Sequence, residues 1–311
     1  MGPGPKRALA QVWAAEAQRS SLPVIPFVSA SYAFPEVMGV TRWSALGFGA
    51  LAGAMLTFPA QAAQAARQGA ALWAGAVAPV LGPYMVCMLM LTSRVPCGPW
   101  ARAALCWLCG SPGGAKLMQP LALRGREALR FAALSGTMSP LFFLSTVSAW
   151  LGDARWGRII LLCHFAGALL LALCIPAGPG GKKAAVAPVP LGSALKETAL
   201  ALGTVALCMM LGCAAAEMAA CALPGLSPAA GALAQCCLEV TAGVRAVIAL
   251  NAPHTPALVC AACSFGGLSL LMQNAAFWQD SGVSLSRLFL LRACHALLSG
   301  GLCLILTRMI Y

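Results

Sequence analysis

The chain has 311 residues, of which 60% are hydrophobic and only 9% charged, whereas soluble domains carry about a quarter charged residues. So little polar side chain cannot cover a soluble globule of this length, which excludes a water-soluble enzyme and predicts an all-α polytopic membrane protein. The net charge of +12 is expected to lie mainly in loops that face anionic lipid headgroups, so no nucleic-acid partner is expected.

The first membrane half is predicted over residues 43–175, after an N-terminal cytoplasmic segment of residues 1–42. Residues 100–109 are apolar but too short to cross a bilayer. The Gly- and Pro-rich stretch "CGSPGGAK" that follows them is not expected to be helical, so together they predict a re-entrant half-helix and loop. The other expected elements are a lead helix at 43–58, an interfacial helix at 59–69, and spans at 72–92 (bent by Pro79 and Pro83), 131–150 and 156–175.

A linker rich in Pro, Gly and Lys, residues 176–192, separates this half from a second membrane half over residues 193–311. Glu239 lies in an apolar segment that the run "EVTAG" interrupts, which predicts a second half-helix and loop. The expected elements of this half are a long helix at 193–223, the interrupted segment at 227–250, and spans at 256–277 (broken by "SFGGLS") and 285–307.

Two short segments in comparable places resemble one another: "CWLCGSPGGAK" from Cys106 and "CAACSFGGLS" from Cys260. They favour two inverted repeats with broken or re-entrant helices, about seven membrane crossings and two re-entrant elements. A cytoplasmic N-terminus then places most Lys and Arg residues inside, in agreement with the positive-inside tendency. Chance similarity between segments of low complexity is the alternative.

Residues at the breaks are the candidates for binding a solute, because a broken helix exposes backbone amides and carbonyls at membrane depth. Ser and Thr hydroxyls, a Lys and a buried Glu would add side-chain contacts. For the Gly- and Pro-rich motif, the alternative to a binding site is a kink that serves helix packing, with the Lys116 side chain extending to the membrane interface. For Glu239, the alternative is an ion pair with Arg245 at the interface. The predicted binding residues are Gly110, Ser111, Gly113, Gly114, Lys116, Ser139, Glu239, Thr241, Ser264, Gly266, Gly267, Ser269 and Gln273.

No cofactor or metal is expected, although the Cys106/Cys109 and Cys260/Cys263 pairs could together supply four thiolates. The chain uses 15 Cys freely in apolar runs, which favours packing as their role. His164 and His295 lie mid-span without a catalytic pattern around them, so an enzyme is not expected. Glu217, deep in a helix, is a further candidate for carrying protons.

Several ordered motifs resemble one family. "GSPGGAK", "SPLFFLSTVSAWLGDARWGRIILLCHFAGALL", "LEVTAG" and "FGGLSLLMQ" are similar to the YlbJ family of sporulation integral membrane proteins, which belongs to the nucleoside-recognition or Gate-domain membrane proteins. The resemblance extends over residues 69–307. It departs from the family pattern at Cys109, Ser111 and Leu271.

The resemblance implies a multi-pass protein of the bacterial cell membrane with a role in forming the endospore cortex. A transporter-like permease that holds a small polar solute between the two broken-helix motifs is the expected function. The alternative is a non-transporting scaffold that docks other sporulation membrane proteins through basic cytoplasmic loops, chiefly residues 116–130 and the linker. A second copy of the chain, in a homo-oligomer, is a further candidate partner.

Overall fold

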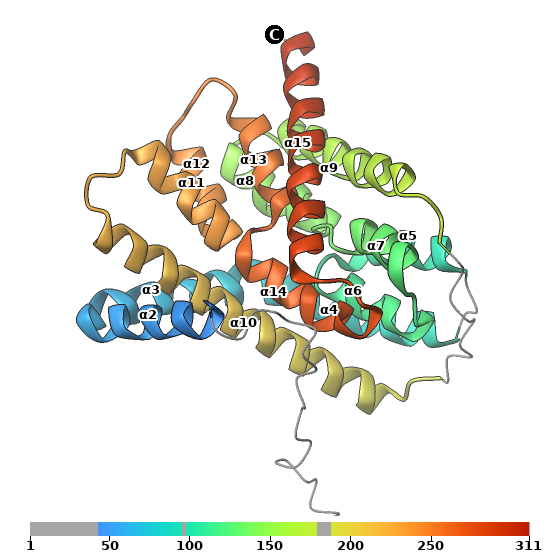
Figure 1. The fold of residues 1–311 in the computed structure, drawn as a ribbon. Helices are drawn as coiled ribbons and strands as arrows, with labels where there is room; N and C mark the ends of the chain where they lie inside the picture. Colours follow the sequence, from blue (N-terminus) through green and yellow to red (C-terminus); the bar gives the residue numbers. More distant parts are fainter. Residues whose placement is uncertain (1–42, 95–97, 179–187, 311) are drawn as a thin grey trace, which may run out of the picture. The chain divides into compact units, whose positions relative to one another are not determined.

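The structure is a computed structural model that describes residues 43–94, 98–178 and 188–310, and these belong to one compact unit. Every regular element in these ranges is a helix (Figure 1). The predicted N-terminal segment and residues 179–187 of the linker lie outside the described part. Five helical stretches are long and apolar enough to cross a membrane: Pro59–Arg94, Ala154–Cys174, Leu191–Ala222, Thr255–Trp278 and Leu285–Ile310.

The helices that open the first half form a longer element than the sequence suggested. A separate interfacial helix ending near Gly69 was wrong, because the chain stays helical from Pro59 to Arg94. Pro79 does not break this helix. A proline ring crowds the carbonyl four residues earlier, and that carbonyl, of Gly75, lies in the wider turn of a π-helix. In order, these elements are α2 (Trp43–Thr57), α3 (Pro59–Leu72), the π-helix η1 (Trp73–Val77) and α4 (Ala78–Arg94).

The rest of the first half contains two broken helices and one long one. "GGAK" within the motif at Cys109 is helical, contrary to expectation, because only residues 110–112 leave the helix. The expected continuous span at 131–150 was also wrong, because the chain leaves the helix before Pro140. The elements are α5 (Pro99–Cys109), α6 (Gly113–Met118), η2 (Gln119–Leu121), α7 (Gly125–Ser135), η3 (Phe142–Val147), α8 (Ser148–Leu151) and α9 (Ala154–Cys174).

The second half breaks where the sequence predicts. Glu239 interrupts one helix in an extended conformation, and Gly266, with φ +82°, ends another in the left-handed conformation that suits glycine. The elements are α10 (Leu191–Ala222), α11 (Pro228–Leu238), α12 (Val240–Ala249), α13 (Thr255–Phe265), α14 (Gly267–Trp278), η4 (Gln279–Ser281) and α15 (Leu285–Ile310).

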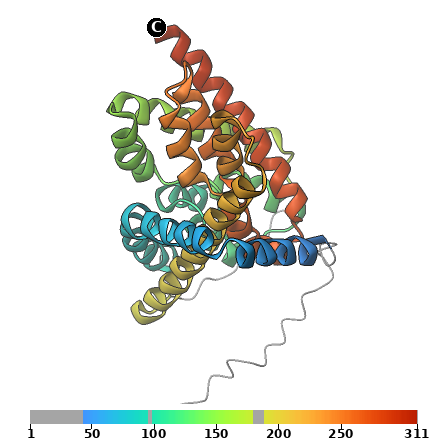
Figure 2. The same ribbon diagram turned by 90° about the vertical axis from the view of Figure 1, so that its left-hand side faces the viewer.

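The two halves share one order of elements: a long helix, two broken helices and a closing long helix. The long helices in equivalent places pack against each other, α3 against α10 and α9 against α15 (Figures 1 and 2). By this order, the break after Cys109 in the first half is equivalent to the break at Glu239 in the second half. The sequence similarity between the two Cys-containing segments instead makes it equivalent to the break at Gly266.

Small residues allow the long helices to approach closely. A Cβ on Gly69 would lie 2.9 Å from the Cα of Met210, whereas one on Gly82 would meet Leu202 at 3.3 Å. The residue numbers therefore fall along α10 as they rise along α3 and α4, so these helices run in opposite directions. The outer face of α10 is apolar, with Leu200 73% exposed, as expected of a surface that faces lipid.

Replacing Gly69 by Leu is expected to disrupt the packing of α3 on α10. Overpacking of a close helix contact costs about 1–3 kcal/mol, which corresponds to a fall in Tm of about 2–10 °C in detergent. Gly203→Leu in α10 is the matched control, because a Cβ there would have no neighbour within 4 Å. Equal melting temperatures for the two variants would contradict the described packing.

Candidate functional site

The two breaks of the first half are bonded to each other. The amide of Ser111 donates a hydrogen bond to the carbonyl of Thr137 at 2.7 Å. Gly110 has φ +73°, and a Cβ there would lie 2.5 Å from the amide nitrogen of Ser139. Gly110 is therefore required both for its backbone conformation and for the close approach of the second break.

The two breaks of the second half also lie together. Glu239 caps α12, since its Oε2 accepts a hydrogen bond from the amide of Ala242 at 2.7 Å. A Cβ on Gly267, the first residue of α14, would lie 2.9 Å from the carbonyl oxygen of Cys236 near the end of α11. Gly110, Gly114 and Gly267 thus allow close approach of another backbone segment. A Cβ on Gly113 or Gly266 would instead meet the side chain of Cys109 or of Leu270.

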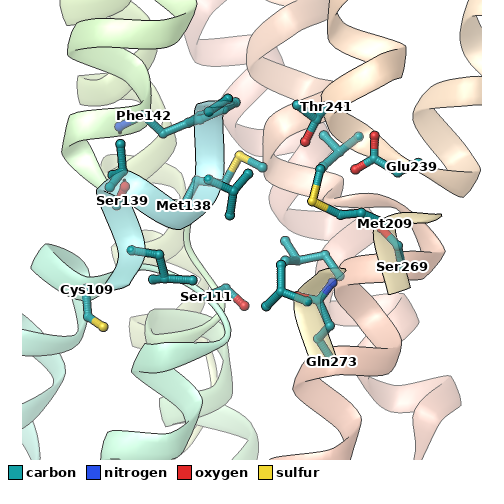
Figure 3. A pocket seen from close by; sticks show the side chains of 17 residues that line it. Cys109, Ser111, Met138, Ser139, Phe142, Met209, Glu239, Thr241, Ser269 and Gln273 are labelled. Carbon is teal, nitrogen blue, oxygen red and sulfur yellow. Dashed lines mark hydrogen bonds between the residues drawn. The ribbon is translucent and has the colours of Figure 1, made fainter. Parts of the chain in front are cut away.

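A cavity of about 60 Å³ lies where residues of the two halves meet (Figure 3). Ser111 and Ser139 come from the breaks of the first half, and Figure 3 shows the labelled side chains of the second half on the opposite side. Apolar side chains of η1, α4 and α10 complete the lining, together with Cys109, Met138, Phe142, Val240 and Leu270. Six predicted binding residues line this cavity: Ser111, Ser139, Glu239, Thr241, Ser269 and Gln273.

The polar atoms of the cavity leave acceptors for a ligand. Ser111 Oγ donates to Asn274 Oδ1 at 2.7 Å, while Asn274 Nδ2 donates to the carbonyl of Leu270. Gln273 is 1% exposed, and its Oε1 has no hydrogen-bond partner among the described residues. A buried acceptor without a partner costs about 1–3 kcal/mol, so a solute that donates a hydrogen bond there would be favoured.

The other predicted binding residues do not line the cavity. Lys116 instead forms an ion pair with Glu197, with Nζ and Oε2 3.0 Å apart, and lies over the ring of Phe277. Ser264 is bonded to His164, with Oγ and Nδ1 2.8 Å apart. The remaining members outside the lining are Gly110, Gly113, Gly114, Gly266 and Gly267.

The predicted alternative for Glu239, an ion pair with Arg245, does not form in the structure. The guanidinium of Arg245 lies over the ring of Trp150, with its carbon 5.8 Å from the centroid. Glu239 is 1% exposed and lines the cavity.

A buried hydrogen-bond network that the sequence did not reveal supports the second break of the first half. Arg292 Nη1 donates to the carbonyl of Gly136 at 2.8 Å and lies 3.1 Å from His295 Nδ1. His295 Nε2 lies 2.8 Å from the carbonyl of His164, and the amide of Met138 donates to His164 Nε2 at 3.1 Å. The three-residue spacing of Arg292 and His295 indicates that they lie on one face of a helix, but it does not identify their partners in other elements.

The cysteine pairs belong to separate buried clusters. Cys106 and Cys109 pack with residues of α4 to α7, whereas Cys260 and Cys263 pack with residues of η3, α9, α11 and α12. Within the described ranges, no group of three or more His, Cys, Asp or Glu side chains could hold a metal ion.

Comparison of this chain with models of protein families, with curated proteins and with solved structures finds no match.

Replacing Arg292 by Met is expected to lower the free energy of unfolding by about 2–4 kcal/mol, because Gly136 and His295 each lose a buried donor. Denaturant titration of the purified protein in mild detergent measures this loss. Arg287→Met is the control, since Arg287 lies exposed on the same helix. If the two variants unfold alike, Arg292 does not support the break at Gly136.

Proposed function

We propose that this chain is a transporter-like membrane protein that binds a small polar solute between its two halves and translocates it. The observation that carries the proposal is the central cavity, which polar residues from helix breaks of both halves line. Breaks at membrane depth are costly unless a cavity or a protein neighbour satisfies their backbone groups. Transporters use such breaks to surround a substrate.

The cavity favours a small solute with hydrogen-bond donors. About 60 Å³ is room for roughly four water molecules, which favours a solute smaller than a nucleoside in this conformation. The Glu239 carboxylate and the Gln273 carbonyl are acceptors, and Lys116 is paired outside the lining. We therefore propose an amine, an amide or a small hydroxylated compound as the solute.

Inverted repeats and alternating access are part of the same proposal. The shared order of elements and the opposed directions of α3 and α10 support an inverted relation of the halves. Polar contacts between the halves would have to break when access alternates. They include the Lys116–Glu197 ion pair and the hydrogen bond, 3.1 Å long, that Arg124 donates to the carbonyl of Asp280. The hydrogen bonds described above between Ser111 and Asn274, between His164 and Ser264, and between Arg292 and Gly136 also join the two halves.

Membership of the YlbJ family, with a role in endospore cortex formation, is proposed on the sequence motifs alone. Seven crossings, a bacterial cell membrane and a cytoplasmic N-terminus belong to this proposal. A scaffold is the second candidate, because Arg124 and Arg126 are exposed and could contact anionic headgroups or other sporulation proteins. Charge reversal of Arg126, which is not one of the contacts named between the halves, should weaken a scaffold function and leave solute binding intact.

Gln273→Leu and Glu239→Gln are expected to weaken solute binding at least tenfold, because each removes a buried acceptor or its charge. Thermal stability of the purified protein, screened against small amines, amides, amino acids and nucleosides, measures binding. Thr204→Val is the control, because this exposed threonine of α10 bonds only within its own helix. A stabilising compound that acts equally on all three variants would place the site elsewhere.

Lys116→Glu and Glu197→Lys are each expected to favour the state in which their end of the molecule is open. Loss of a partly exposed ion pair, about 1 kcal/mol, changes the population of such a state about fivefold. Alkylation of Cys109, which lines the cavity, by a water-soluble maleimide reports the opening when measured by mass spectrometry. The double variant, in which the two charges are exchanged, should restore the slow alkylation of Cys109. If the single variants are alkylated as slowly as wild type, the ion pair does not control access to the cavity.

A further inference from the structure

A second, larger cleft of about 600 Å³ lies where α8, α9, α12, α13 and α15 meet, near the C-terminal end of α15. It shares no lining residue with the central cavity. Its side chains combine two large aromatic rings with polar and basic groups. Those that matter here are Trp150, Trp156, Asn251, His254, Thr255 and Arg308.

The position and composition of the cleft are those expected at the surface of a membrane. Trp156 is in the first turn of α9 and Arg308 in the last turn of α15, and both helices are long and apolar enough to cross a membrane. Tryptophan is enriched where spanning helices meet the lipid headgroups, because its ring is apolar and its N–H is polar. A ligand of this cleft therefore meets both headgroups and water.

The electrostatics of the cleft favour an anion. Arg308 is exposed, and no Asp or Glu is among the lining residues. A second guanidinium, that of Arg245, lies over the ring of Trp150. The N-terminus of α13, at Thr255, adds a partial positive charge.

Asp153 is the acidic residue closest in sequence to the lining residues Trp150 and Trp156, and it is already paired with an arginine. Asp153, between α8 and α9, forms an ion pair with Arg155, with Oδ2 and Nη2 2.9 Å apart. Hydrogen bonds from the Arg155 side chain and amide hold the pKa of Asp153 below its ordinary value, so this carboxylate stays charged and paired. It does not neutralise Arg308.

Apolar surface continues beside the basic group. Ile305 and Met309 flank Arg308 on α15 and are 60% and 77% exposed. Acyl chains can lie along such a surface while the headgroup reaches the cleft. A guanidinium matches the oxygens of a phosphate with two parallel hydrogen bonds.

We propose that this cleft binds a phosphate group at the membrane surface, held by Arg308 and flanked by Trp150 and Trp156. The adjoining apolar face of α15 makes an anionic phospholipid the favoured carrier of that phosphate. The site does not depend on the proposed transport function, since its residues are separate from the central cavity.

Native mass spectrometry of the full chain, released from detergent after incubation with phosphatidylglycerol, tests the proposal. Wild type is expected to retain phosphatidylglycerol, and Arg308→Gln to retain about tenfold less, the effect of one lost charge-assisted contact. Arg308→Lys should keep most of the binding because it keeps the charge. Arg287→Gln removes an exposed cation near the other end of α15 and should bind like wild type.

A parallel titration with inorganic phosphate and glycerol phosphate, followed by thermal stability, separates the two sources of phosphate. Stabilisation of wild type but not of Arg308→Gln by these compounds, without retained phosphatidylglycerol, would support a phosphate site for a soluble ligand. Equal lipid retention by Arg308→Gln and Arg287→Gln would overturn the proposal. The absence of both lipid retention and phosphate stabilisation in wild type would overturn it as well.

Discussion

One constraint determines the arrangement of this chain: every backbone amide and carbonyl at membrane depth needs a hydrogen-bond partner within the protein. Lipid offers no hydrogen bonds, so the polar groups at each break in a helix must find partners within the protein. Ser111 bonds to the carbonyl of Thr137, Met138 to the ring of His164, and Glu239 to the amide of its own helix. Because the breaks satisfy one another or are satisfied by buried side chains, they gather near the middle of the fold, and the polar cavity lies among them.

The long helices provide the frame that holds these breaks in place. Glycines at the contacts of α3 with α10 and of α9 with α15 let the backbones approach, as is usual where helices pack in lipid. Gly69 contacts the backbone of Met209 and Met210, and Gly167 adjoins Ser299. Close packing of the frame leaves the polar groups of the breaks little freedom, which keeps a small cavity open at a defined place.

The sequence predicted three of the four breaks, because Gly110, Glu239 and Gly266 interrupt apolar runs with residues that disfavour a buried helix. The break before Pro140 was missed, since hydropathy averages over it and predicts one span. The Ala- and Gln-rich stretch after Pro59 resembles an interfacial helix, yet tertiary packing against α10 makes it part of a longer one. Six of the residues that the sequence singled out line one cavity, and their role in binding stays a prediction. The partners of Lys116 and Arg292 could not be predicted, because they depend on contacts between distant segments.

The hydrogen bonds around His164 and His295 fix where their protons lie. His164 Nε2 accepts from Met138, so Nδ1 carries the hydrogen toward Ser264; His295 Nδ1 accepts from Arg292, so Nε2 carries the hydrogen toward the carbonyl of His164. Both rings are thereby neutral and neither has a vacant nitrogen. The two imidazoles therefore join the break at Met138 to α15 as uncharged links, so they add no second buried charge beside the guanidinium of Arg292.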